Sequence, residues 1–249
     1  MNIRRKILNG VFGTFVALGL LSTSTAHALV TEGDASAYAL NATLFGSPLV
    51  GPIPYSTANG NESDSDSVIS LDTAFLDTGI LNSSASSNVD GTPGSKTAES
   101  SSSIAFFDLD VLQNGLSADL ISSYTNVSGD YGSFNAIGNS SILGLTGYGI
   151  FAPLNGVTIT GEANQTLLDV AGIQVIANRQ TSTCSATDCF MTTDALYINA
   201  LGKVTLTLAS SSAHLAAPIP EPETYALMMM GLAGLAGSKR IRNRMKSIA

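Results

Sequence analysis

The chain has no tryptophan, two cysteines, two histidines and few charged residues for its 249-residue length. The missing tryptophan disfavours a dedicated lectin site, because such sites often stack sugars on aromatic rings. Basic residues are scarcest in the body of the chain, between Leu29 and Ala217. This body contains three of them, Lys96, Arg179 and Lys203, and seventeen acidic residues, for a net charge of −14. So acidic a body argues against binding nucleic acid or anionic polymers by charge.

The scarcity of histidine also limits catalysis. His27 lies in the N-terminal leader described below, so His214 is the only histidine of the body, and it lies just before the C-terminal segment. A Ser-His-Asp site needs a histidine that reaches an activated serine, and the chain has no Gly-x-Ser-x-Gly motif. The sequence therefore predicts no catalytic residue, no cofactor and no metal site, and a protein that is not an enzyme.

Two acidic patterns leave alternatives open. The pairs Asp108 with Asp110 and Asp72 with Asp77 have the residue type that a glycosidase needs, but solvated strand faces are the preferred interpretation of both. The segment Asn61–Asp66 alternates oxygen ligands as calcium loops do, but it lacks the glycine and final glutamate of an EF-hand loop. The wider segment 59–67 is expected to be polar and mobile.

The N-terminus predicts a secretory signal peptide over residues 1–28. Arg4, Arg5 and Lys6 precede a mostly apolar stretch over residues 7–21, and Ala26-His27-Ala28 forms an A-x-A cleavage site. We expect the Sec translocon and signal peptidase to handle this segment, with cleavage after Ala28.

The C-terminus carries three unlike elements in a fixed order. Pro220-Glu221-Pro222 precedes a thirteen-residue apolar run over residues 225–237, and five bases follow between Lys239 and Lys246. A stable span needs about 20 apolar residues, so this short helix suits a transient inner-membrane anchor. The bases are expected to stay on the cytoplasmic side.

This order resembles the PEP-CTERM sorting signal of Gram-negative bacteria, with Pro220, Glu221 and Pro222 matching its signature tripeptide. The resemblance assigns residues 218–249 to a sorting domain. It implies recognition by an exosortase and export linked to extracellular polysaccharide. An ordinary C-terminal membrane anchor is the other interpretation of the same segment.

The two cysteines, Cys184 and Cys189, have four residues between them in a body expected to be exported. In an oxidising compartment such a pair is typical of a disulfide, and no histidine lies nearby to make it a metal site. We expect the bridge to hold a turn between strands over residues 167–178 and 190–198.

The sequence predicts one all-β domain over residues 29–217. Short alternating runs separated by Gly, Asn, Asp and Pro dominate, without a long helical stripe. The pattern predicts a single antiparallel β-sandwich or partly rolled sheet of roughly ten strands, flanked by an N-terminal signal helix and a short C-terminal hydrophobic helix. The clearest unit is a hairpin of residues 101–112 and 116–127 with Asn114-Gly115 at the turn.

The body also resembles the bacterial surface proteins called choice-of-anchor P. The matching segments include Ala35–Leu40, Val50-Gly51-Pro52, Leu116–Ile121 and Asp194–Ile198. That family pairs a β-rich body with different C-terminal anchors and has no catalytic residues to carry over. Together these patterns predict a non-enzymatic protein of the cell surface or extracellular matrix, associated with biofilm polysaccharide. A carbohydrate-binding or carbohydrate-cleaving module acting on that matrix is the alternative.

Overall fold

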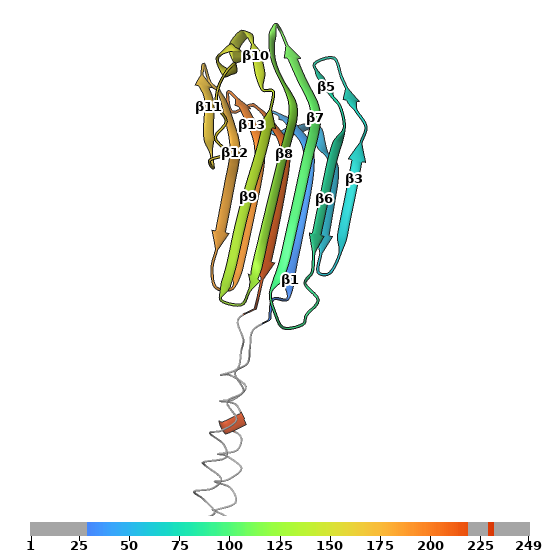
Figure 1. Cartoon of the computed structure of the whole chain (residues 1–249), viewed down its shortest axis with the longest axis vertical. Helices are drawn as coiled ribbons and strands as arrows, with labels where there is room; N and C mark the ends of the chain where they lie inside the picture. The colour runs from blue at the N-terminus through green and yellow to red at the C-terminus, as the bar shows by residue number, and fades with distance from the viewer. Residues whose placement is uncertain (1–28, 219–228, 232–249) are drawn as a thin grey trace, which may run out of the picture. The chain divides into compact units, whose positions relative to one another are not determined.

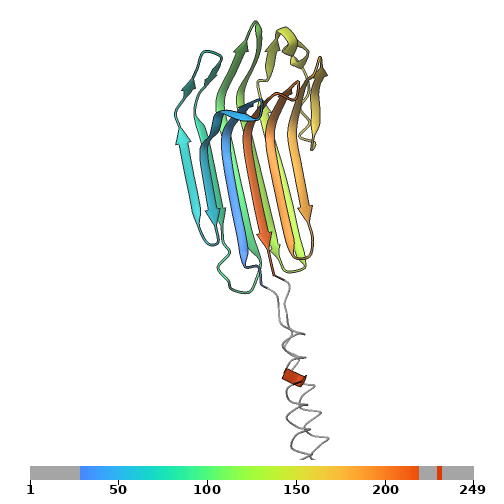
Figure 2. The same cartoon turned by 180° about the vertical axis from the view of Figure 1, so that it is seen from behind.

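The computed structural model describes residues 29–218 and 229–231, and Leu29–Ile219 forms one compact unit. The prediction of an all-β antiparallel fold is confirmed. The strands form two sheets that lie face to face (Figures 1 and 2). Alternating small, hydroxyl and aliphatic residues explain this result, because every strand presents one face to a neighbouring layer.

The first sheet has six strands and contains both ends of the described body. Its order is β11 (Gln165–Val170), β12 (Ile173–Cys184), β13 (Asp188–Ala200), β14 (Val204–Ala216), β1 (Glu32–Leu44) and β2 (Ser47–Asn59). Strand β2 lies at the edge of this sheet, which is where its prolines, lacking an N–H donor, are tolerated.

The second sheet has eight strands built around the long hairpin of β7 (Lys96–Val111) and β8 (Asn114–Asp130). Strand β9 (Ser133–Leu143) and the short β10 (Thr146–Tyr148) pair with β8, and a 3-10 helix, η1 (Gly149–Leu154), follows. On the other side, β6 (Leu81–Ser87) and β5 (Leu76–Thr78) pair with β7, β3 (Ser63–Val68) pairs with β6, and β4 (Leu71–Asp72) with β5.

The described residues therefore contain fourteen strands, where the sequence predicted roughly ten. The difference comes from short or polar strands. Strands β4, β5 and β10 have two or three residues, too few to show a period, and β3 consists almost entirely of serine and aspartate. Neighbouring strands hold these segments extended, and their own residues show little strand preference.

The interior between the sheets changes character along the strands. At one end lies an aliphatic core, with Leu40, Phe107 and Leu208 fully buried. At the other end lies an alanine core, which includes Ala98, Val127 and Ala213. Between them the central strands bury hydroxyl residues, which we call the hydroxyl belt: Ser56, Ser83, Ser100, Ser102, Ser123, Thr125, Thr193, Ser210 and Ser211.

Hydroxyls of the belt join the two sheets directly. Ser100 Oγ donates to the Ser212 carbonyl at 2.8 Å, and Ser102 Oγ donates to the Ser210 carbonyl at 3.1 Å. Thr125 Oγ1 reaches both the carbonyl and the hydroxyl of Ser211, at 3.1 and 2.8 Å. Small side chains bring the sheets close enough for these bonds, and the bonds satisfy polar groups that would be costly to bury alone.

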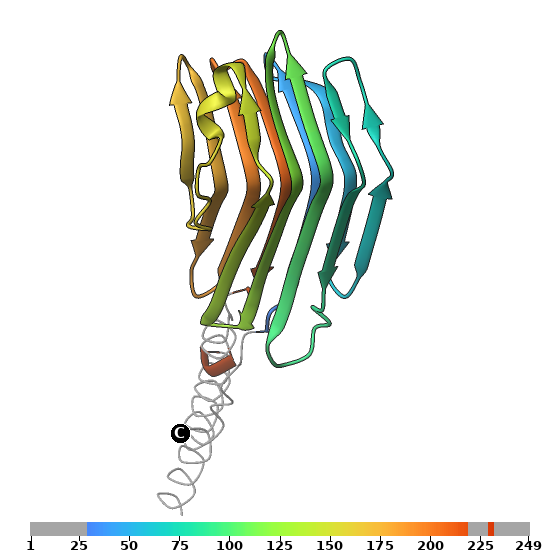
Figure 3. The same ribbon diagram turned by 45° about the horizontal axis from the view of Figure 1, so that its top comes forward.

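The positions that face inward shift by one residue within single strands, between the aliphatic core and the hydroxyl belt. In β14 the inward residues are Leu206 and Leu208 before Ala209, but Ser211 and Ala213 after it. Ala209 has a φ of 50°, a left-handed conformation that is uncommon outside glycine. Phe106, with a φ of 61°, marks the same change in β7. The strands bend midway along their length (Figure 3).

The predicted position of the β7–β8 turn was wrong by two residues. Val111 pairs with Asn114, so Leu112 and Gln113 form the turn, with φ values of 50° and 64°. Asn114 instead stabilises the turn, because its side-chain amide donates a hydrogen bond to the Leu112 carbonyl at 3.0 Å. Gly115 makes room for the ring of Tyr148, which would collide with a Cβ atom there.

Candidate functional site

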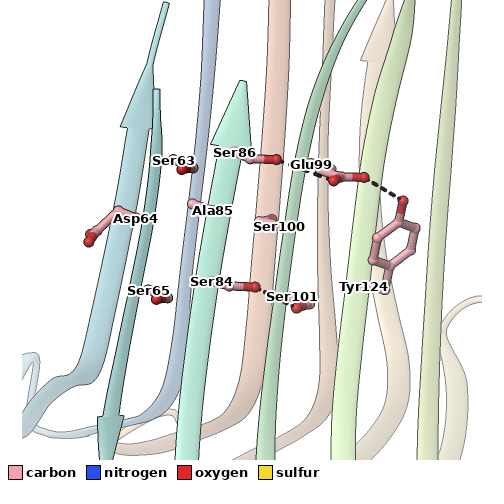
Figure 4. Close-up of a pocket in the computed structure, with 10 residues that line it drawn as sticks. All are labelled: Ser63, Asp64, Ser65, Ser84, Ala85, Ser86, Glu99, Ser100, Ser101 and Tyr124. Carbon is pink, nitrogen blue, oxygen red and sulfur yellow. Dashed lines mark hydrogen bonds between the residues drawn. The ribbon is translucent and has the colours of Figure 1, made fainter. Parts of the chain in front are cut away.

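The outer surface of the eight-stranded sheet carries a polar depression of about 490 Å³. Alternation in β6 and β7 produces it, because the residues next to each inward side chain face solvent. We call this surface the serine face, and it consists of Ser63, Ser65, Ser84, Ser86, Glu99, Ser101 and Tyr124 (Figure 4). Asp64 also borders the depression but points to the other side of β3.

Glu99 and Tyr124 organise the serine face. The Tyr124 phenol donates to Glu99 Oε2 at 3.0 Å, and the Ser86 hydroxyl donates to Glu99 Oε1 at 3.2 Å (Figure 4). One row further along the strands, the hydroxyls of Ser84 and Ser101 are 2.8 Å apart. Cross-strand register creates both rows, since Ser86 lies opposite Glu99 and Ser84 opposite Ser101.

Tyr124 combines a partly exposed ring with a fixed hydroxyl. Partial burial, followed by the hydrogen bond to the Glu99 carboxylate, raises the pKa of the Tyr124 phenol above its ordinary value of 10.0. The phenol therefore stays protonated at neutral pH and acts as a donor. Uncharged hydroxyls, an aromatic ring and one carboxylate are groups that can hydrogen-bond and pack against a polyhydroxylated ligand. This face was not predicted, although the serine-rich segments 82–86 and 99–103 are a signal for it.

The predicted carboxylate pairs lie at the other end of the same sheet. Asp77 of β5 is in register with Asp72 of β4 and with Asp108 of β7, so three of the four predicted carboxylates share one row, while Asp110 pairs with Gly115. Like charges directly opposite each other on adjacent strands are destabilising. Asp110 is exposed and accepts a hydrogen bond from Tyr148, and this bond raises the pKa of the Tyr148 phenol.

The segment predicted to be mobile, residues 59–67, is ordered instead, because most of it belongs to β2 and β3. Ser65 lies on the serine face, whereas Asp64 accepts a hydrogen bond from the Thr57 amide at 3.1 Å on the other side. A strand sends successive side chains to opposite faces, so the alternating oxygens of Asn61–Asp66 do not converge on one ion. Within residues 29–218 and 229–231, no group of three or more His, Cys, Asp or Glu side chains is arranged to hold a metal ion.

His214 lies near the end of β14, the last strand of the body, where the sequence placed it. Its Nδ1 lies 2.8 Å from a carboxylate oxygen of Asp34, and its Nε2 lies 3.2 Å from one of Asp188. Burial lowers the pKa of the imidazole, but the hydrogen bonds to Asp188 and Asp34 outweigh it and raise the pKa above 6.5. With both ring nitrogens bonded to carboxylates, the ring is poorly placed to take a proton from a serine.

The predicted disulfide between Cys184 and Cys189 is confirmed. The two residues are a register pair of β12 and β13, with Cα atoms 4.0 Å apart. Ser185 shapes the enclosed turn, since its backbone amide donates to the Asp188 carbonyl at 2.7 Å. The bridge thus closes the hairpin in which the sequence placed it.

Comparison with protein families identifies the C-terminal segment. Residues 218–241 match the PEP-CTERM protein-sorting motif. The match overlaps the predicted signature Pro220, Glu221 and Pro222. This PEP-CTERM motif indicates an exported protein that an exosortase sorts to the cell surface of a Gram-negative bacterium. It covers the tail alone, so the resemblance of the body to choice-of-anchor P proteins stays a prediction.

The other comparisons add little about the body. No curated protein matches the chain. Among solved structures, Neisserial surface protein A (NspA) is similar over 74% of this chain and 94% of its own, at 11% identity and a TM-score of 0.16. A likeness at this TM-score supports no conclusion about fold or function.

The targeting residues lie outside the part of the chain that the structure describes. This applies to Ala26 and Ala28 of the predicted cleavage site and to Pro220, Glu221 and Pro222 of the sorting motif. No helix among the described residues is long and apolar enough to cross a membrane.

Proposed function

We propose that this exosortase substrate is a non-enzymatic component of the cell surface or extracellular matrix, and that its serine face binds a neutral polysaccharide. The observation that carries the proposal is the array of paired hydroxyls around Glu99 and Tyr124. Hydroxyls donate and accept hydrogen bonds as sugars do, and the Tyr124 ring offers an apolar surface to a sugar face. The acidic body disfavours an anionic polymer.

The geometry around this depression favours binding over cleavage. Glycoside hydrolysis needs two carboxyl groups about 5–10 Å apart on either side of the scissile bond. Of the two acidic residues that border the depression, Glu99 faces it while Asp64 points away (Figure 4). Both oxygens of Glu99 already accept hydrogen bonds from Tyr124 and Ser86.

A binding assay with extracellular polysaccharide from an exosortase-encoding bacterium tests the proposal. Tyr124→Ala should weaken binding about two- to tenfold, because a lost aromatic contact is worth about 0.5–1.5 kcal/mol. Ile137→Ala, on the outward side of β9, is the matched control and should bind like the unchanged protein. Equal binding by the Tyr124→Ala and unchanged proteins would refute the role of the serine face.

A carbohydrate-cleaving module is the second candidate, and the row Asp72–Asp77–Asp108 favours it. Three carboxylates on adjacent strands supply the residue type for acid–base chemistry. Release of new reducing ends from the same polysaccharide, abolished by Asp108→Asn, would establish this candidate and displace the first. We expect no release.

We further propose that the tail anchors the precursor only transiently in the inner membrane before exosortase processing. The thirteen-residue apolar run over residues 225–237 supports this, being shorter than the roughly 20 residues of a stable span. Replacing Pro220, Glu221 and Pro222 with alanine should retain the precursor in the inner membrane. Mass spectrometry of mature protein from an exosortase-positive host is decisive, and a product that keeps residues 225–246 would contradict processing.

A further inference from the structure

Three hairpin turns at one end of the sandwich present bulky apolar side chains to solvent. Phe45 begins the β1–β2 turn, Leu112 the β7–β8 turn and Leu201 the β13–β14 turn, and we call these residues the apolar tips. They are 70%, 90% and 68% exposed. The turns lie at the end of the body opposite to residues 29 and 218 (Figures 1 and 2).

The backbone makes this choice of residues unexpected. Phe45, Leu112 and Leu201 have φ values of 51°, 50° and 54°, in the left-handed region. Tight hairpin turns ordinarily place glycine, asparagine or aspartate at such positions, because a bulky side chain is strained there. Each tip therefore carries both backbone strain and exposed apolar surface, a combination that points to a function.

Contacts between neighbouring loops join two of the tips into a continuous rim. The Phe45 amide donates to the Lys203 carbonyl at 2.5 Å, and the Leu201 amide donates to the Gly172 carbonyl at 2.7 Å. Leu44, Leu49 and Val204 add partly exposed aliphatic surface beside Phe45 and Leu201. The rim consists of turns from separate hairpins and presents protruding side chains.

Lys203 adds a cation at the same place. Among the described residues, Lys96 is ion-paired with Asp90 and Arg179 with Asp194, whereas Lys203 has no ion pair. Its ammonium lies 5.6 Å from the centre of the Phe45 ring. In a body so rich in carboxylates, the one unpaired base stands beside the exposed aromatic tip. A lysine beside apolar side chains can reach a phosphate while they enter an apolar layer.

We propose that the apolar tips insert into the surface of a phospholipid bilayer, with Lys203 contacting a headgroup phosphate. Apolar side chains at the boundary of headgroups and acyl chains gain burial there, and a single lysine adds a modest attraction. Asp110 lies near the β7–β8 turn and Asp169 near the β11–β12 turn that contacts Leu201, so insertion should depend on apolar burial more than on anionic lipid. This contact is independent of the polysaccharide proposed for the serine face.

The lack of tryptophan gives a direct test with the full chain. Phe45→Trp places a single tryptophan at a tip, and Tyr55→Trp places one on exposed β2 surface as the matched control. With phosphatidylcholine vesicles that carry dibrominated acyl chains, fluorescence at position 45 should be quenched several-fold more than at position 55. The targeting ends can hold either variant at the vesicle, but only insertion of the tips distinguishes the two positions.

Further variants define the occupant and the contact. Leu201→Ser in the Phe45→Trp background should weaken quenching at least tenfold, whereas Ile137→Ser should leave it unchanged. Leu201→Trp repeats the test if Phe45→Trp does not fold. Equal quenching at positions 45 and 55, or none at either, would overturn the proposal. A concentration-dependent blue shift of the position-45 tryptophan without lipid would also overturn it, because a second copy of the chain would then cover the tips.

Discussion

Two regions of the sandwich interior, the aliphatic core at one end and the hydroxyl belt in the middle, hold the same pair of sheets together by different means. In the aliphatic core, large side chains such as Phe107 and Leu208 fill the space between the sheets. In the hydroxyl belt, Ser100, Ser102 and Thr125 are small and bond to the opposite backbone. The difference teaches that serine in this body is partly a packing residue. Shortening a side chain should therefore lower stability most in the aliphatic core, and enlarging one should lower it most in the hydroxyl belt.

The largest effect is expected from a cavity in the aliphatic core. Leu208→Ala should lower the free energy of unfolding by about 2–5 kcal/mol, because a fully buried leucine loses its transfer energy and leaves a void. Urea unfolding followed by circular dichroism measures this. Leu201→Ala, at an exposed turn, is the control and should change stability little. Equal losses for both variants would contradict the location of this core.

In the hydroxyl belt, enlarging a side chain should lower the free energy of unfolding more than shortening it. Ser102→Ala removes the hydrogen bonds to Ser123 and to the Ser210 carbonyl and should lose about 0.5–1.5 kcal/mol for each. Ser102→Leu loses the same bonds and should be less stable than Ser102→Ala by a further ~1–3 kcal/mol, because the added volume forces the close sheets apart. Ser103→Leu, one residue along on the outer face, controls for the side-chain change itself. The same unfolding assay decides, and a Ser102→Leu protein as stable as Ser102→Ala would show that the sheets are not closely packed there.

The disulfide near the alanine core should contribute less to the free energy of unfolding than a bridge that closes a long loop. Replacing Cys184 and Cys189 with serine should lower the free energy of unfolding by less than ~3 kcal/mol, because the bridge closes a very short loop. Alkylation of the unchanged mature protein without reductant should find no free thiol. Full labelling of both cysteines would reject the bridge. Denaturation with and without reductant gives an independent comparison.

The smallest expected effect is the pH dependence from His214. Its pKa is raised in the folded state above the ordinary 6.5, so protonated His214 stabilises the fold between Asp34 and Asp188. This contribution is fully present below about pH 6.5 and is lost as the pH rises through the higher folded pKa. Urea midpoints between pH 5 and 9 should show a fall that His214→Gln abolishes. A urea midpoint that rises over this range in the unchanged protein, but not in the His214→Gln variant, would contradict a raised pKa of His214.

Local chemistry determined much of this protein by itself. Alternating serine, threonine and aliphatic residues predict an all-β body, and residue spacing alone brings Cys184 and Cys189 within reach of a bridge. The PEP-CTERM motif is likewise a linear signal, since its order along the chain is what identifies it. Each of these features depends on neighbours in sequence, and a local pattern can therefore specify it.

The tertiary structure decided which residues meet and which face of a strand turns inward. His214 and Asp34 are 180 positions apart and meet only because β1 and β14 pair. The shift of the inward positions at Ala209 and the turn at Leu112 depend on what the opposite sheet and η1 accept, so the alternation pattern alone placed neither. Alternation fixes a side chain relative to its own strand, whereas the serine face and the apolar tips exist only where register aligns several strands.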